Sequence, residues 1–258
     1  MICTRTSICS ILGSLVLSGL ISTTVSAGTA KPVSTPPPNV PSFSPAFPGQ
    51  TRAPEVISNV KLDQEIIARN LKNPWAIEVL PDGRLLVTER AGLLRVISLD
   101  GAVSSPVQGL PKVEVRGQGG LLDVALGPDF RNDRMIYWSY AEAREGKKNA
   151  TSVARGRLSE DMSRITDAEV IFRQQPAWDS RLHFGSRLVW DREGLLYITL
   201  GERSLPEIRG QAQQLDGHIG KVVRIHADPD NEQAEFAIIV GKQMTGNGYG
   251  SLLMNRII

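Results

Sequence analysis

Short apolar runs, separated by Gly, Pro, Asn and Asp, make up most of the chain from about position 56 onwards. No long segment keeps the 3.6-residue apolar period that an amphipathic helix requires. Runs of this length, bounded by turn-forming residues, are typical of β-strands joined by tight turns. The pattern therefore predicts an all-β fold.

The apolar runs recur in a fixed plan: a strand, a turn that contains Asp, a second strand, and then outer strands. The turns carry Asp82, Asp129 and Asp191. We expect strand pairs around these turns at 75–80 with 84–89, 121–126 with 135–140, and 186–190 with 195–200, and outer strands at 93–98, 152–158, 169–173 and 221–226. Repeating units of about four strands predict the blades of a β-propeller, and a β-sandwich is the alternative architecture.

In the third unit a histidine precedes the first strand and an acidic residue follows the second. Ser186–Trp190 and Leu195–Leu200 flank the turn signal at 191–194, so they should form an antiparallel hairpin. The start of one strand and the end of the other then share an edge, which brings His183 close to Glu202. An imidazole beside a carboxylate is a suitable arrangement for a general base.

In a propeller, the loops that enter the innermost strands gather on one face, where small molecules usually bind. Three such loops are expected at 71–74, 115–120 and 180–185. The second strands of the first and third units end on the same face, which adds two charged pairs there: Glu89 with Arg90, and Glu202 with Arg203. His218 and His226 are expected to be packing or surface residues.

The composition is that of an ordinary globular protein, with 258 residues, 41% hydrophobic, 22% charged and a formal net charge of +2. Such a balance gives no indication of a nucleic-acid-binding surface.

The first 27 residues differ from the rest of the chain and read as a secretory signal peptide. Arg5 is followed by a mainly apolar or small stretch from 8 to 21, and Val25-Ser26-Ala27 resembles a cleavage site. An uncleaved membrane anchor is the alternative. Cleavage would remove Cys3 and Cys9, which are both cysteines of the chain, so the mature protein would have neither disulfides nor a catalytic thiol. We expect a periplasmic or secreted bacterial protein with no membrane span after cleavage.

Residues 28–55 are rich in proline and should form an extended, disordered linker. The predicted organisation is a signal peptide (1–27), the linker (28–55), a partial propeller (56–228) and a divergent tail (229–258).

Several stretches resemble the soluble quinoprotein sugar dehydrogenases of the glucose/sorbosone type, which depend on pyrroloquinoline quinone (PQQ). They are NPWAIEVLPDGRLLVTERAGLLRVI, GQGGLLDVALGPDF, NATSVARGRL, HFGSRLVWDREGLLYITLGE and QLDGHIGKVVRI. Together they cover roughly 66–228, in the order of the first three blades of that family. The resemblance implies a six-bladed propeller that oxidises the anomeric hydroxyl of an aldose to a lactone, with PQQ and Ca²⁺ as cofactors and an external electron acceptor.

The resemblance also implies roles for individual residues. His183 matches the histidine that removes the hydroxyl proton and contacts the cofactor, and Glu202 stands where an acidic residue orients that histidine. Gln118 matches a glutamine that contacts cofactor and sugar. Leu182 departs from the pattern, since glucose-oxidising members carry a polar residue there, and the departure puts the identity of the sugar in question.

The resemblance ends near Asp228, before the family's arginine, lysine and calcium-binding stretches. We therefore expect a truncated propeller of about three blades, with apolar faces exposed on its first and last sheets and impaired PQQ binding. Two alternatives remain: a non-catalytic propeller or pseudo-enzyme, and a calcium-dependent hydrolase of the lactonase type.

Overall fold

The computed structural model describes residues 31–34, 41–42, 44, 47 and 53–227, and the backbone of 234–237. The chain divides into two units, Met1–Gln64 and Glu65–Ile258. In the first unit the described residues lie outside helices and strands, apart from a bridge that pairs Pro32 with Pro54. The predicted signal peptide lies outside the described residues, and the boundaries at 27, 55 and 228 stay predictions.

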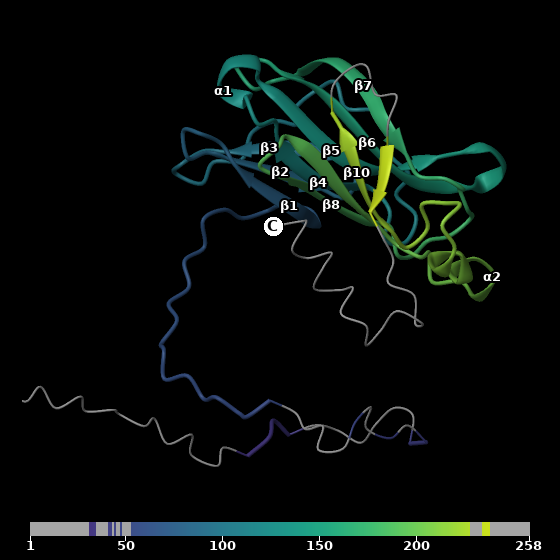
Figure 1. Cartoon of the computed structure of the whole chain (residues 1–258). Coiled ribbons are helices and arrows are strands. Elements are labelled where there is room, and N and C mark those ends of the chain that lie inside the picture. The colour runs from purple at the N-terminus through teal and green to yellow at the C-terminus, as the bar shows by residue number, and fades with distance from the viewer. Residues whose placement is uncertain are drawn as a thin grey trace, which may run out of the picture. The chain divides into compact units, whose positions relative to one another are not determined.

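The second unit consists mainly of antiparallel sheets, which confirms the predicted all-β class (Figure 1). The first sheet has the order β1-β2-β3. Its strands are β1 (Pro74–Val79), β2 (Leu85–Glu89) and β3 (Leu93–Ile97).

The second sheet has the order β4-β5-β6-β7. Its strands are β4 (Leu121–Leu126), β5 (Met135–Ala143), β6 (Asn149–Leu158) and β7 (Ile165–Arg173). A short helix, α1 (Phe130–Asp133), lies in the turn between β4 and β5, and a 3₁₀ turn, η1 (Glu145–Lys147), joins β5 to β6.

The third sheet has the order β11-β10-β9-β8. Its strands are β8 (Gly185–Trp190), β9 (Leu195–Leu200), β10 (Val222–His226) and β11 (Ala234–Ala237). The connection from β9 to β10 contains α2 (Pro206–Arg209) and the 3₁₀ turn η2 (Gly210–Gln213). The predicted hairpin is confirmed, because β8 pairs antiparallel with β9 and Gly185 stands opposite Leu200.

Each sheet runs from an innermost strand to an outermost one, and the innermost strands β1, β4 and β8 are neighbours in turn. One buried apolar cluster joins the first and second sheets and includes Leu86, Leu121 and Trp138. A second cluster joins the second and third sheets and includes Tyr137 and Ile198. Successive up-and-down sheets packed face to face in this way are propeller blades, as the repeat predicted.

The third sheet extends further along the chain than the sequence indicated. Residues 229–258 were predicted to form a divergent tail, but the backbone of β11 pairs with β10 from Val222 opposite Ala237 to Ile225 opposite Ala234. The edge of β10 offers unpaired N–H and C=O groups, and a following extended segment can satisfy them whatever its resemblance to a family. The third sheet therefore includes 234–237, within the predicted tail.

Candidate functional site

His183 lies in the loop that leads into β8, two residues before the strand begins at Gly185. Its backbone is in the left-handed region, with φ of 45°, as is that of Gly185, with φ of 76°. Non-glycine residues adopt this conformation infrequently, and functional sites are among the places where they do. The turn presents the imidazole to solvent, with 45% of the side chain exposed.

Glu202 lies two residues beyond the end of β9, at the same edge of the hairpin. Its Oε1 is 2.7 Å from Nδ1 of His183. Because a carboxylate can only accept a hydrogen bond, this contact assigns the proton to Nδ1 and leaves the lone pair of a neutral ring on Nε2. The side chains predicted to be neighbours are thus in contact, in the tautomer that a general base needs.

The electrostatics of the pair follow from this contact. Burial alone would raise the pKa of the Glu202 carboxyl, but hydrogen bonds from His183 and nearby backbone groups hold this pKa below its ordinary value of 4.5. Because the folded-state pKa is the lower one, the pair contributes fully to stability above about pH 4.5. That contribution is lost as the pH falls through the folded-state pKa.

Replacing His183 by Ala is expected to raise the pKa of Glu202 towards its ordinary value, because the main lowering hydrogen bond disappears. A carbon-13 NMR titration of the glutamate carboxyls would measure the change. His226→Ala, in an exposed position on β10, is the matched control and should leave Glu202 unaffected. An unchanged titration of Glu202 in His183→Ala would contradict the pairing.

Gln118 belongs to the loop that leads into β4 of the second sheet, yet it contacts the third-sheet loop. Its Oε1 accepts a hydrogen bond from the backbone N–H of His183 at 2.9 Å. Its own backbone N–H donates to the carbonyl of Arg181 at 2.8 Å. The two loops are therefore fastened together, and the structure brings Gln118, His183 and Glu202 to one place.

The residue after Glu202, Arg203, is a buried arginine whose partners could not be found from the sequence. Arg203 is 1% exposed, and its guanidinium carbon stands 3.9 Å from the centre of the Phe184 ring. It donates to the Asn149 side chain and, at 3.0 Å, to the carbonyl of Ser180. Burial, with the nearby charge of Arg116, lowers the pKa of Arg203 to about 10. Arg203 thus ties the residues beside His183 and Glu202 to the second sheet.

Sequence reading placed Arg203 on the loop face but could not find its partner. Asn149 is 54 positions away and begins an outer strand of a different sheet. In the sequence, Asn149 stands out only as the start of the glycosylation sequon Asn149-Ala150-Thr151. The structure buries all three residues.

The other charged pair of this face has a structural environment. Glu89 is 1% exposed, accepts a hydrogen bond from the backbone of Lys72 at 2.5 Å and pairs with Arg95 at 3.0 Å. Arg90 donates to backbone carbonyls of the next entry loop, Val115 and Gly119 among them. Both side chains hold loops together at the edge of the site.

Residues that were set aside lie as expected. His218 accepts a hydrogen bond from the backbone of Gln175 and packs against Phe172, with ring centres 5.2 Å apart. His226 is exposed on β10. Leu182 is 37% exposed and directly precedes His183, so the loop exposes an apolar residue next to the histidine in the chain.

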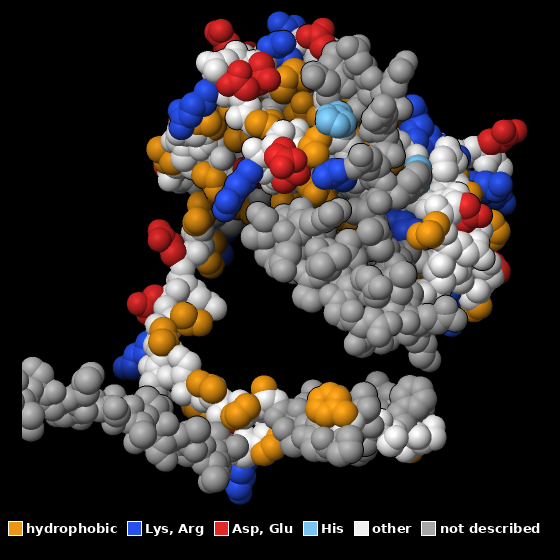
Figure 2. Space-filling view, viewed as in Figure 1, with side chains coloured by type: hydrophobic (Ala, Val, Ile, Leu, Met, Phe, Trp, Pro, Cys, Tyr) orange, Lys and Arg blue, Asp and Glu red, His pale blue; other side chains and the backbone are white. Residues whose placement is uncertain are grey.

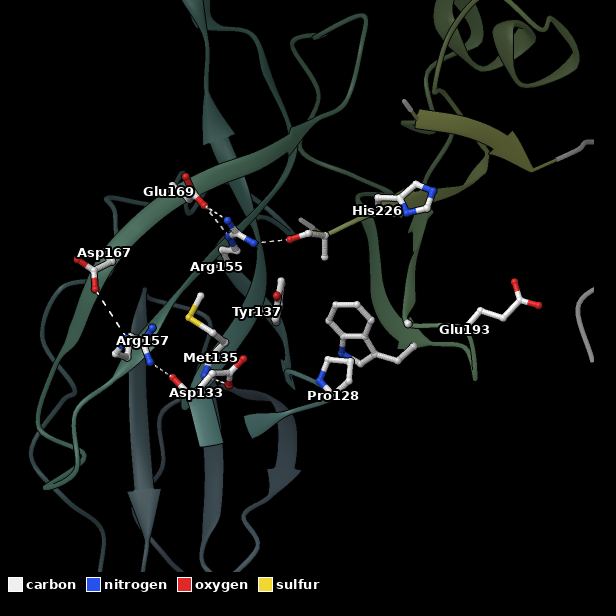
Figure 3. Close-up of a pocket in the computed structure, with 13 residues that line it drawn as sticks. Pro128, Asp133, Met135, Tyr137, Arg155, Arg157, Asp167, Glu169, Glu193 and His226 are labelled. Atoms are coloured by element: carbon white, nitrogen blue, oxygen red, sulfur yellow. Dashed lines mark hydrogen bonds and ion pairs between the residues drawn. The ribbon is translucent and has the colours of Figure 1, made fainter. Parts of the chain in front are cut away.

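A hollow of about 610 Å³ lies elsewhere, between the outer parts of the second and third sheets (Figure 3). Its cations are already paired: Arg155 with Glu169, and Arg157, more loosely at 3.9 Å, with Asp167. His183, Glu202 and Gln118 do not line it. Among the described residues, no group of three or more His, Cys, Asp or Glu side chains could hold a metal ion. No helix in the described ranges is long and apolar enough to cross a membrane.

Comparison with known proteins agrees with this fold. The model of the Glucose / Sorbosone dehydrogenase family matches residues 71–237, so the chain belongs to that family. The match runs past Asp228, where the sequence resemblance was expected to end, and includes β11.

The chain is similar to the aldose sugar dehydrogenase YliI of Escherichia coli, with 45% identity over 162 residues, which are 62% of this chain and 43% of the relative. A crystal structure of the soluble aldose sugar dehydrogenase from E. coli, in the apo-form, matches with 44% identity and a TM-score of 0.60, over 63% of this chain and 46% of that one. The PQQ-bound form of an aldose sugar dehydrogenase from Streptomyces coelicolor matches with 26% identity and a TM-score of 0.56, over 63% and 47%. The chain therefore spans less than half the length of these relatives, and its sheets are those of a partial propeller.

Proposed function

We propose that this chain carries the proton-accepting side of a PQQ-dependent aldose dehydrogenase, which oxidises the anomeric hydroxyl of a sugar to a lactone. The observation that carries the proposal is the hydrogen bond between His183 Nδ1 and Glu202, with Gln118 holding the histidine backbone. The aldose activity named for the E. coli relative and the PQQ in the Streptomyces structure support the class of reaction.

The chemistry assigned to the residues is proton transfer. Oxidation of the sugar removes the hydroxyl proton together with the hydrogen on the anomeric carbon, which leaves with its electron pair. PQQ, when bound, supplies the two-electron acceptor. His183 accepts the hydroxyl proton at Nε2, and Glu202 stabilises the resulting imidazolium and keeps the ring oriented, as the carboxylate does in hydrolase triads.

The described residues suit the reacting end of this site better than they suit the anionic cofactor. PQQ carries carboxylates, which proteins usually hold with arginine or lysine. Arg116, on the second entry loop, already pairs with Glu114 at 2.7 Å and Asp179 at 2.8 Å. Arg203 is buried, and Arg90 donates to backbone carbonyls. Arg181, exposed on the loop before His183, has no ion pair within the described part of the chain and is the remaining candidate. We infer that so few cations bind the cofactor only weakly, and Ca²⁺ stays a prediction from the family resemblance.

The sugar specificity of the site would differ from that of glucose-oxidising members. The exposed side chain of Leu182, the residue before His183, can contact the apolar face of a sugar but can form no hydrogen bond with its hydroxyls. A sugar bound here would lose one polar contact on that side.

The test is reconstitution of the chain with PQQ and Ca²⁺, followed by dye reduction with a panel of aldoses. We expect PQQ-dependent turnover far below that of the E. coli enzyme measured alongside, because Arg116, Arg203 and Arg90 are already engaged by protein groups. Each charge-assisted hydrogen bond that they do not give to the cofactor is worth about 1.5–3 kcal/mol, or roughly 10- to 100-fold in binding. His183→Ala should abolish this turnover, whereas His226→Ala should not.

Each of the other outcomes has a defined meaning. Turnover equal to that of the E. coli enzyme would contradict the impairment, and activity that survives His183→Ala would contradict the assigned base. If no aldose gave PQQ-dependent turnover, the non-catalytic alternative would replace the dehydrogenase proposal for this chain.

A further inference from the structure

The first and second sheets are joined by a hydrogen bond from a buried hydroxyl. Thr88, on β2, accepts a hydrogen bond from the backbone N–H of Ala76 in its own sheet at 3.0 Å. Its hydroxyl then donates to the carbonyl of Leu122, on β4 of the next sheet, at 2.6 Å. One side chain thus links an inner strand to the inner strand that follows it around the propeller.

The same link recurs between the second and third sheets. Ser139, on β5, accepts from the backbone N–H of Asp123 at 3.0 Å and donates to the carbonyl of Ser186, on β8, at 2.8 Å. In both cases a hydroxyl on the second strand of one sheet binds the second residue of the next inner strand. Thr88 and Ser139 therefore occupy equivalent positions in their sheets, as do Leu122 and Ser186 on the inner strands that accept their hydrogen bonds.

In the third sheet, the equivalent hydroxyl accepts the hydrogen bond from its own inner strand. Thr199, on β9, accepts from the backbone N–H of Arg187 at 3.0 Å, as Thr88 and Ser139 do from their own inner strands. Among the described residues, its hydroxyl has no acceptor equivalent to those of Thr88 and Ser139. The equivalent acceptor position on the first sheet is the carbonyl of Trp75, because Trp75 precedes Ala76 as Leu122 precedes Asp123.

The outward faces of these two sheets also expose apolar side chains. On β1, Trp75 is 48% exposed, and Ile77 and Val79 are each 59% exposed. On the third sheet, Val189 is 52% exposed and Val222 is 41% exposed. Figure 2 shows hydrophobic side chains at the surface over the first sheet. Leu188 of the third sheet occupies the position equivalent to Ile77 and is covered by the second sheet. It is only 5% exposed, so a neighbouring sheet buries a side chain at this position.

We propose that two copies of this chain pair head to tail, with the first sheet of each packed on the third sheet of the other. The third sheet carries the donor hydroxyl of Thr199 and the first sheet carries the equivalent acceptor position, so these two faces of the described sheets are complementary. A head-to-tail contact closes into a ring when the rotation fits. Two identical interfaces then form at once.

The repeated contacts predict which residues meet in the pair. The hydroxyl of Thr199 donates to the Trp75 carbonyl of the other copy. Within one chain, Asp123 accepts the backbone N–H of Leu188 at 2.7 Å. Arg187 occupies on the third sheet the position that Asp123 occupies on the second, and Ile77 occupies on the first sheet the position of Leu188 on the third. In the pair, Arg187 of one copy therefore lies beside Ile77 of the other. The Arg187 side chain is 64% exposed and carries a charge that can distinguish variants at position 77.

Sedimentation equilibrium of the purified chain across the micromolar range tests the pairing. We expect the mass of two chains, with dissociation on dilution. Thr199→Val replaces the hydroxyl by a methyl group at both interfaces of the ring. It should raise the dissociation constant of the pair on the order of 10-fold. Circular dichroism of each variant checks that the sheets remain folded.

Charge variants at position 77 test the orientation. Ile77→Lys places a cation beside Arg187 of the other copy and should raise the dissociation constant at least about 100-fold. Ile77→Glu meets the same guanidinium with opposite charge and should weaken the pair much less. Leu99→Lys, at a position that is 75% exposed in the turn after β3, is the matched control and should leave the pair intact.

Three results would overturn the proposal. The first is a single-chain mass throughout the concentration range, and the second is an open series of larger oligomers. The third is equal weakening by Ile77→Lys and Ile77→Glu, which would indicate that first sheets pair with each other. None of these measurements depends on PQQ or on catalysis, so the pairing can fail or hold independently of the proposed activity.

Discussion

Gly201→Ala is expected to disrupt the site and destabilise the third sheet. A Cβ atom at position 201 would lie 1.9 Å from the carbonyl oxygen of His183 and 2.3 Å from its carbonyl carbon. Backbone atoms cannot move aside as a flexible side chain can, so the hairpin must open at the edge that carries His183 and Glu202. We expect a loss of about 1–3 kcal/mol in the free energy of unfolding, the usual cost of overpacking.

Urea denaturation would measure this loss, and the pKa of Glu202 would report whether its contact with His183 survives. Gly210→Ala is the matched control, because a Cβ there meets nothing within 4 Å and the backbone of Gly210 is right-handed. That control should be neutral or slightly stabilising. A Gly201→Ala protein with normal stability and a normal Glu202 titration would contradict the close approach of the two backbones.

The contact between His183 and Glu202 could be predicted from the sequence because it depends on one local element. The turn signal at 191–194 and the alternation of apolar residues around it specify a hairpin, and a hairpin fixes which residues share an edge. The partner residues are adjacent to that edge, so no information about distant parts of the chain was needed. The roles assigned to them remain proposals.

Contacts between sheets could not be predicted in the same way. The link from Gln118 to His183 and the link from Arg203 to Asn149 join residues of different blades. No local pattern marks such partners, because their proximity results from how whole sheets pack. The family resemblance brought Gln118 to the site, whereas Asn149 carried no comparable signal.

The strand β11 illustrates a different limit. The sequence stretches that resemble the family were expected to end near Asp228, and residues 229–258 were therefore predicted to form a divergent tail. Strand pairing depends on the unpaired edge of β10 and on an extended backbone, which a divergent sequence can still supply. The family match also extends to residue 237, so family likeness and strand formation agree over β11.

Asp123→Ala is expected to weaken the junction between the second and third sheets. Asp123 is 2% exposed, accepts the backbone N–H of Leu188 at 2.7 Å and pairs with Arg187 at 2.9 Å. Burial raises the pKa of its carboxyl, and the Leu188 hydrogen bond and the Arg187 charge only partly oppose this. Alanine would leave the buried N–H of Leu188 without an acceptor, at a cost of about 1–3 kcal/mol, and would also remove the ion pair.

Asp123→Asn separates these two effects, because an amide oxygen can still accept the N–H of Leu188 while the negative charge is lost. Urea denaturation should therefore rank the wild type above Asp123→Asn, and Asp123→Ala lowest. Asp100→Ala, in an exposed turn, should stay close to the wild type. If Asp123→Asn were as unstable as Asp123→Ala, the ion pair with Arg187 would contribute more stability than the hydrogen bond from Leu188. If neither variant lost stability, apolar packing and the remaining hydrogen bonds, such as the one from Ser139 to Ser186, would hold the junction without Asp123.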